Sequence, residues 1–192
     1  MASHHHYMLH KPYGYLSQFI NNQSQRKNKK LLGALYEFAE HTMSIGRLDE
    51  KSEGLLLLTT DGKLSDDINS SKVEKEYYVQ VDGLIEQATL EQLAKGIEIK
   101  IRNDFYTTKP AKVKLLDKNE ILEKPANPGR EERHGLTSWI SITLREGKYR
   151  QIRKMTAAVN HPTLRLVRIR IGDMHLTSLK VGETKELSSL DI

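Results

Sequence analysis

The stretch SIGRLDEKSEGLLLLTTDG, residues 44–62, joins a tight turn to the longest aliphatic run of the chain. The turn, Gly-Arg-Leu-Asp, ends at Asp49, and four consecutive leucines occupy positions 55–58. A continuous apolar run bounded by turn residues is typical of a strand that is buried on both faces. Asp61-Gly62 follows as a signal for a tight turn. We therefore predict a buried strand over residues 55–60, with a carboxylate held in the turn before it.

Asp49 has two interpretations. Aspartate is a good helix N-cap, and Ser52-Glu53 follows as it would at a helix start. A reactive carboxylate would instead need a positive neighbour and rigid support. The cations within residues 150–154 could supply the positive charge, and the leucine run could supply the support. Glu53 could pair with Asp49 as in a glycosidase, but the spacing is a weak signal, and one tryptophan leaves little for a sugar-binding cleft. The residues alone leave the role of Asp49 open.

Strands and short helices alternate along the chain without a regular parallel rhythm. This pattern predicts an α+β fold with a central mixed, mostly antiparallel sheet and flanking helices. Gly96 is expected to end the helix before it, and the Pro- and Gly-rich residues 125–135 are expected to form a loop. We predict further strands over 7–10, 76–83, 97–101, 109–116, 139–144 and 164–171, and helices over 31–39, 64–69, 85–95 and 149–159.

The helix predicted over 149–159 has one apolar and one basic stripe. Its apolar stripe comprises Ile152, Met155, Thr156 and Val159. In the basic stripe, cations lie three or four residues apart, and like charges at that spacing destabilise a helix slightly. A surface selected for stability alone would therefore include acids. A ridge that faces phosphates or acidic groups is one explanation, and a solvated basic face is the other. Three cations share the opposite face of this helix: Arg150, Arg153 and Lys154.

The strand predicted over 164–171 extends this basic character. Its apolar alternation changes phase near Val167, which predicts either a bulge there or burial of both faces. Residues 145–170 contain eight arginines and lysines but a single acid, Glu146. Residues 26–30 form a second basic run, which is either a solvated loop or a phosphate contact. A concentration of cations in one region is typical of a nucleic-acid surface.

Composition limits the class of protein. The 192 residues fit one domain or two small subdomains, and 38% hydrophobic with 29% charged residues is typical of a folded globular chain. The net charge of +5 favours a polyanionic partner. Without cysteine there is no disulfide, thiolate nucleophile or cysteine metal site, which is compatible with the cytosol. We expect neither a secretory signal nor a membrane helix.

The first six residues, MASHHH, are expected to be the remnant of a tag, with the domain beginning near Tyr7. The other histidines do not show the spacing of a zinc site, so we expect no metal. They are scattered over the chain at His10, His41, His134, His161 and His175.

Four separated stretches together resemble the bacterial rRNA pseudouridine synthases of the RsuA type. HKPYGYLSQF (10–19) is similar to the first motif of the family, and GRLDEKSEGLLLLTTDG (46–62) to its signature. KEYYVQVDG (75–83) resembles the strand that follows, and EGKYRQIRKMTAAVNHPTLRLVRIRIG (146–172) the C-terminal motif. The stretches occur in the order of the family and span nearly the whole chain.

The resemblance implies a role for particular residues. Asp49 matches the catalytic aspartate, which attacks the target uridine at C1′ of the ribose or at C6 of the base. Tyr77 matches the tyrosine that stacks on the flipped base, and Arg153 the basic residue that pairs with the aspartate. Arg47 matches an arginine placed against the RNA, and Leu166 falls near a pocket-lining position. Further RNA contacts are expected at Lys11, Lys75, Arg150 and Lys154.

The resemblance also implies an architecture and a partner. Residues 7–192 would form a catalytic domain of two subdomains flanking a basic cleft, without the S4-type RNA-binding domain of many relatives. The expected reaction turns a uridine of ribosomal RNA, with 23S RNA as the expected substrate, into pseudouridine without metal or cofactor. We expect a cytoplasmic monomer, since no exposed apolar stripe is evident. The alternatives are a non-catalytic rRNA-binding assembly factor on the same fold, and a carboxylate-based hydrolase of a nucleoside or sugar.

Overall fold

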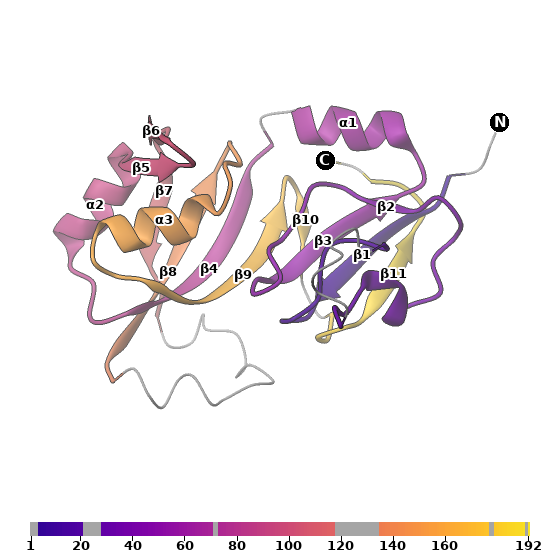
Figure 1. Ribbon diagram of the computed structural model, residues 1–192, viewed down its shortest axis with the longest axis horizontal. Helices are drawn as coiled ribbons and strands as arrows, with labels where there is room; N and C mark the ends of the chain where they lie inside the picture. The colour runs from indigo at the N-terminus through magenta and orange to yellow at the C-terminus, as the bar shows by residue number, and fades with distance from the viewer. Residues whose placement is uncertain (1–3, 21–27, 71–72, 118–134, 177–178, 191) are drawn as a thin grey trace. The chain divides into compact units, whose positions relative to one another are not determined.

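The computed structural model divides the chain into two compact units, shown in Figure 1. Unit 1 comprises residues 1–73 and 167–192, and unit 2 comprises residues 74–166. Each unit combines β-strands with at least one helix, and most strand pairs are antiparallel, which confirms the predicted α+β class. The structure describes residues 4–20, 28–70, 73–117, 135–176, 179–190 and 192.

The sheet of unit 1 is built around the leucine strand. Its strand order is β11-β1-β3-β9, with short strands β2 on β3 and β10 on β9. The pairing of β1 with β11 and with β3 is antiparallel, whereas β3 runs parallel to β9. The strands are β1 (His6–Lys11), β2 (Met43–Ser44), β3 (Glu53–Thr59), β9 (Thr163–Ile171), β10 (Met174–His175) and β11 (Thr184–Leu187).

Strand β3 is buried along its whole length, as predicted. On one face, Leu56 and Leu58 pack in a cluster with Tyr7, Leu9 and Leu32. The strand begins at Glu53, directly after the turn in which Ser52 N donates to Asp49 O over 3.0 Å. The interpretation of Asp49 as the N-cap of a helix is therefore wrong, because the chain enters a strand there.

The helix after β3 was predicted correctly, and the one expected over 31–39 was not. Helix α1 (Gly62–Ser70) begins where Asp61 Oδ1 accepts a hydrogen bond from Leu64 N. The expected earlier helix is reduced to a single 3₁₀ turn, η1 (Leu32–Ala34). The ring of Phe38 instead packs edge-on against Tyr7, with centroids 5.2 Å apart, so aromatic burial outweighs the helical spacing.

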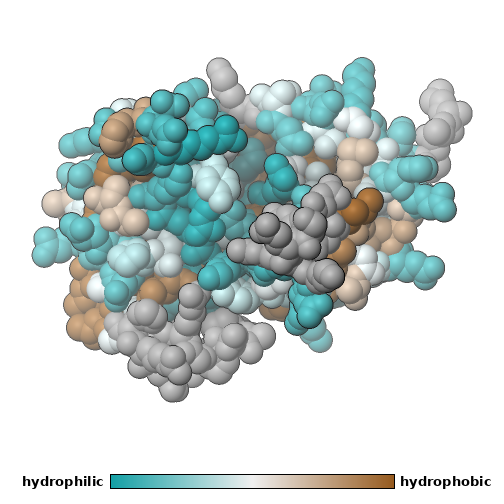
Figure 2. Space-filling view, in the orientation of Figure 1, coloured by the Kyte–Doolittle hydropathy of each residue, from teal (hydrophilic) through white to brown (hydrophobic). Residues whose placement is uncertain are grey.

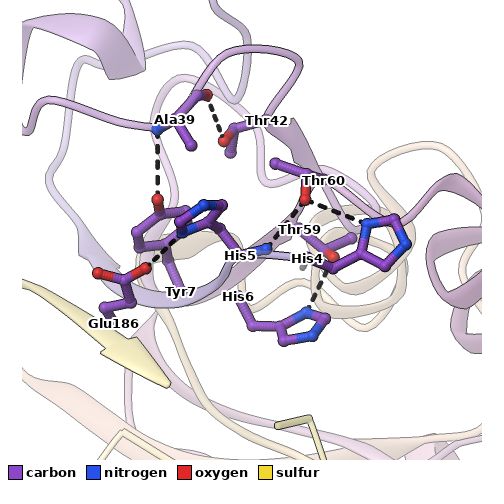
Figure 3. Close-up of polar contacts among 9 residues, drawn as sticks. All are labelled: His4, His5, His6, Tyr7, Ala39, Thr42, Thr59, Thr60 and Glu186. Atoms are coloured by element: carbon purple, nitrogen blue, oxygen red, sulfur yellow. Dashed lines mark hydrogen bonds and ion pairs between the residues drawn. The ribbon is translucent and has the colours of Figure 1, made fainter. Parts of the chain in front are cut away.

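Residues at the start of β1 form polar contacts with neighbouring strands (Figure 3). The strand begins at His6, inside the stretch expected to be a tag, and His6 Nδ1 lies 2.9 Å from Thr59 Oγ1. His5 Nδ1 lies 2.7 Å from Glu186 Oε1, and His5 N donates to Thr60 Oγ1. The side chains of His5 and His6 therefore contact β11 and β3, and the backbone of His5 contacts the residue after β3.

Unit 2 contains antiparallel strands of the nine-stranded sheet and has its own apolar core. Strand β8 lies between β4 and β7, and a hairpin of β5 and β6 forms a second small sheet. Helix α2 lies against β7, and α3 lies against β5. The elements are β4 (Lys75–Asp82), α2 (Gln87–Lys95), β5 (Glu98–Ile101), β6 (Asp104–Thr107), β7 (Lys112–Leu115), β8 (Thr137–Leu144) and α3 (Gln151–Ala158).

Most predicted elements of unit 2 are confirmed with shifted ends. Gly96 ends α2 as expected, with a left-handed φ of 102°. Strand β6 was not predicted, because its sequence DFYT is too short to show alternation. Of the loop expected over 125–135, only Gly135 lies among the described residues.

Strand β9 passes from unit 2 into unit 1 between Leu166 and Val167. The four consecutive residues 165–168 are all buried, so the phase change in the sequence reflects burial of both faces. Leu166 packs in the core of unit 2, whereas Val167 pairs with Glu53 of β3 in unit 1. The change of phase therefore marks the point at which the strand leaves one core for the other.

Candidate active site

The Asp49 turn is held on one side by a buried serine. Ser17 Oγ accepts a hydrogen bond from Leu48 N over 3.0 Å and donates one to Leu48 O over 2.9 Å. Gly46 opens the turn with a φ of +66°, a conformation that glycine adopts at little cost. Asp49 itself is half-buried. Both backbone groups of its neighbour Leu48 are thus satisfied by a single side chain.

The other side of the turn is held by Lys11, the last residue of β1, and by Gly14 just after it. Gly14 N donates to Glu50 O over 2.8 Å, and Lys11 Nζ donates to Ser52 O over 2.8 Å. The same ammonium donates to Pro12 O over 3.0 Å. Hydrogen bonds from residues 11–17 therefore fix the turn at positions 48, 50 and 52.

Lys11 is a buried cation, with 0% of its surface exposed. Burial lowers the pKa of its ammonium to about 7, and the carboxylates of Glu53, Asp49 and Glu50 oppose that shift. Arg168 adds a smaller lowering effect on the same pKa. The Asp49 turn therefore has beside it a positive group whose charge is sensitive to pH near neutrality.

Arg168 contributes a second buried cation from β9. Its side chain is 2% exposed, and its Nε donates to Leu55 O over 2.7 Å. Gly54 allows β3 and β9 to approach closely at this arginine. The φ of Gly54 is +103°, and a Cβ there would lie 2.3 Å from Arg168 O. The sequence did not predict that Arg168 is buried and bonded to β3. An arginine between valine and isoleucine in a strand looks like an outward-facing residue.

Three of the remaining predicted residues lie on the strands of unit 2. Tyr77 on β4 is half-buried, packs against the apolar core and pairs with Ile142. Lys75 at the start of the same strand is also half-buried. Leu166, 6% exposed, belongs to that core.

The three cations near α3 do not share one helical face, which corrects the prediction. Arg150 is the N-cap residue and has a left-handed φ of 53°, so only Arg153 and Lys154 lie within the helix. Arg153 Nη1 donates to Thr163 O over 3.5 Å, and Lys154 Nζ donates to Lys100 O over 2.6 Å. The chain therefore turns sharply at Arg150 before the helix begins.

The predicted residues thus form two groups, one in each unit. Exposed Arg47 belongs to the group of unit 1 with Asp49 and Lys11, and the other six lie in unit 2. On the face drawn in Figure 2, hydrophilic residues cover most of the surface. Within the described residues there is no cluster of three metal-ligating side chains, and no helix there is long and apolar enough to cross a membrane.

Comparisons with known proteins agree with the motifs. The family model described as RNA pseudouridylate synthase matches residues 5–158. A protein of Vibrio parahaemolyticus named ribosomal large subunit pseudouridine synthase E is 43% identical, covering 94% of this chain and 72% of its own. A protein of the same name from Xanthomonas axonopodis pv. citri is 41% identical, covering 90% and 88%.

Among solved structures, a crystal structure of a pseudouridylate synthase superposes with a TM-score of 0.76 at 29% sequence identity. The superposition covers 97% of this chain and 71% of that one. The likeness in sequence and the likeness in structure thus both extend over most of the chain. The protein is a member of the RNA pseudouridylate synthase family.

Proposed function

We propose that the chain converts one uridine of large-subunit (23S) ribosomal RNA into pseudouridine, with Asp49 as the nucleophile. Membership of the family supports the reaction, and the names of the Vibrio and Xanthomonas relatives support the substrate. The observation that carries the role of Asp49 is its turn, which is held by Ser17 from one side and Lys11 from the other. Catalytic groups act efficiently only when neighbouring residues hold them in place.

The reaction replaces the bond between C1′ of the ribose and N1 of the base by a bond between C1′ and C5. The uridine is first flipped out of the RNA, since its glycosidic bond is otherwise inaccessible. In the C1′ route an Asp49 oxygen bonds C1′ while the C1′–N1 bond breaks. In the alternative route the aspartate adds to C6 at the expense of the C5=C6 double bond, and the C1′–N1 bond breaks afterwards. The base then turns, C5 bonds C1′, the aspartate is released, and the proton lost from C5 is balanced by one gained at N1. The product is an isomer of the substrate.

The other residues would serve this step from their own positions. Tyr77 would stack on the flipped base and is the candidate for moving the C5 proton. Arg153 would pair with Asp49, and Leu166 would line the pocket that excludes water. Arg47 would contact the RNA beside the flipped nucleotide. The remaining proposed RNA contacts are Lys75, Arg150 and Lys154.

Lys11 is better suited to positioning than to phosphate binding. Its ammonium is buried and donates to two backbone oxygens, so its bonds are made within the protein. We propose that residues 7–192 act as a monomeric catalytic domain in the cytoplasm. Size-exclusion chromatography with light scattering tests the oligomeric state, and a dimer would contradict the proposal.

The experiment is pseudouridine mapping on ribosomal RNA from cells that lack this gene. Carbodiimide-dependent primer-extension stops are compared after treatment with the native protein, with Asp49→Asn and with Asp66→Asn. Asp66 is an exposed aspartate of α1 and serves as the matched control. One 23S stop restored by the native protein and by the control, but not by Asp49→Asn, is the expected result.

Other outcomes of this mapping would contradict particular parts of the proposal. Activity of a cleanly purified Asp49→Asn protein would refute the nucleophile. A stop in 16S RNA would refute the substrate. If neither naked RNA nor ribosomal particles gained a stop while RNA binding persisted, the protein would be a non-catalytic assembly factor.

A further inference from the structure

A shallow groove of ≈ 450 Å³ lies in unit 1 beside the Asp49 turn. Its walls come from residues 17–20, the β2 segment 42–44, the turn residues 46–47 and Asn69 near the end of α1. Both β2 and α1 are labelled in Figure 1. The groove is within the size range, about 300–1,000 Å³, of pockets that hold small ligands.

The walls of this groove have the chemistry of a nucleotide site. Gln18 and Asn69 supply side-chain amides, Phe19 supplies a ring and Arg47 a guanidinium. Among the residues that the structure describes, none that lines this groove is acidic. The adjoining groove of ≈ 540 Å³ differs, because Glu37 and Glu40 line it and would repel phosphate.

The groove is joined to the Asp49 turn by direct contacts. Ser17, in its wall, forms the two hydrogen bonds to Leu48 described above. Asn69 Oδ1 lies against Gly46, where an added Cβ would be only 3.1 Å from it. Arg47 and Asp49 are two residues apart, at most about 7 Å along the chain. A nucleotide adjacent to a uridine at Asp49 would therefore be within reach of this groove.

The groove is already formed in the protein without RNA. The rings of Phe19 and Phe38 pack edge-on with centroids 5.3 Å apart, and Phe38 packs in turn on Tyr7 of β1. Tyr7 Oη accepts a hydrogen bond from Ala39 N, as Figure 3 shows. Ser44 Oγ donates to Ser17 O over 3.0 Å. A preformed site loses less conformational entropy when the ligand binds.

We infer that this groove binds the base of an unpaired nucleotide next to the target uridine, and that Gln18 and Asn69 select it. The inference rests on the proposed function. Side-chain amides read base edges through paired donors and acceptors, and unstacked bases pack on aromatic rings. The groove would thus determine which RNA sequence is modified, whereas Asp49 performs the chemistry.

The test uses an RNA hairpin that carries the mapped uridine. Single-turnover rates are measured at increasing protein concentration for the native protein, Gln18→Ala, Asn69→Ala and Asn69→Asp. Gln92→Ala, an exposed amide of α2 in unit 2, is the matched control. We expect the half-saturating concentration to rise about tenfold for each alanine variant, within the range for one amide–base contact. The rate at saturation and the melting temperature should not change.

A second RNA, abasic at the nucleotide adjoining the uridine on the 5′ or the 3′ side, separates a base contact from a structural effect. If the groove holds that base, removing it weakens the native protein but not the Gln18→Ala/Asn69→Ala double variant. Effects that simply multiply, or variants that saturate like the native protein, would overturn the inference while leaving the proposed function intact. A native protein inactive on every RNA would instead refute the proposed function.

Discussion

The ammonium of Lys11 donates a hydrogen bond to the carbonyl oxygen of Ser52, 2.8 Å away, across 41 residues of sequence. This bond joins the end of β1 to the end of the Asp49 turn, just before β3 begins. Because Lys11 is buried, the bond is shielded from water and its strength depends on the charge of the ammonium. The geometry of the candidate nucleophile is thus linked to the protonation of one lysine.

Stability should rise with pH above neutrality because of Lys11. Burial lowers its folded-state pKa to about 7 from the ordinary lysine value of 10.5, so between these values the unfolded chain holds a proton that the folded chain has lost. One such proton contributes a slope of at most about 1.4 kcal/mol per pH unit to the free energy of unfolding. Urea denaturation between pH 7 and pH 10 should give a shallower slope for Lys11→Met. Parallel slopes would show that Lys11 has an ordinary pKa.

Removing the Ser17 hydroxyl should slow the reaction and destabilise unit 1. In Ser17→Ala the buried N–H and C=O of Leu48 lose their partner, at a cost of about 1–3 kcal/mol. The turn then holds Asp49 less firmly, so we expect a lower single-turnover rate at saturating RNA. Ser70→Ala, at an exposed position of α1, is the control and should change neither quantity. A native rate in a destabilised Ser17→Ala protein would show that the Ser17–Leu48 hydrogen bonds stabilise the fold but are not needed to position Asp49.

Gly54→Ala should disrupt the junction of β3 and β9. Its φ of +103° is unfavourable for alanine, and the new Cβ would lie 2.3 Å from Arg168 O and 2.6 Å from Arg168 N. Both atoms belong to the backbone, so relief requires the strands to separate, and we expect a loss of about 3 kcal/mol or more. The measurement is chemical denaturation. Gly147→Ala, where a Cβ meets nothing within 4 Å, should be nearly neutral, and equal stability of the two variants would contradict this account.

Arg47 should contribute to RNA affinity mainly through its charge. It is exposed beside the groove, so Arg47→Ala should weaken binding and reduce the slope of log affinity against log salt by about 0.7–0.9, the value for one phosphate contact. Fluorescence anisotropy over a salt series measures this slope. Lys185→Ala, on the edge strand β11, is the control. An unchanged slope would mean that Arg47 does not contact phosphate.

Local patterns in the sequence predicted the elements whose burial has a regular period. The leucine run of β3, the apolar stripe of α3 and the phase change of β9 each record which faces meet a core, and all three are confirmed. The family could also be predicted from local sequence, because its motifs are continuous stretches of chain. The positions of Asp49, Tyr77 and Arg153 follow from those motifs, and their catalytic roles stay predictions.

Tertiary structure alone decided the features that depend on contacts between distant residues. Lys11 and Arg168 are buried cations, although no local pattern separates them from exposed ones. The ring of Phe38 packs on Tyr7 where the sequence predicted a helix, and Ser17 binds Leu48 from 31 positions away. The sequence by itself determined which face of each element is apolar, because side-chain period is a local property of the backbone. Which polar groups meet in the folded chain depends on the path between them, and that only the folded structure decides.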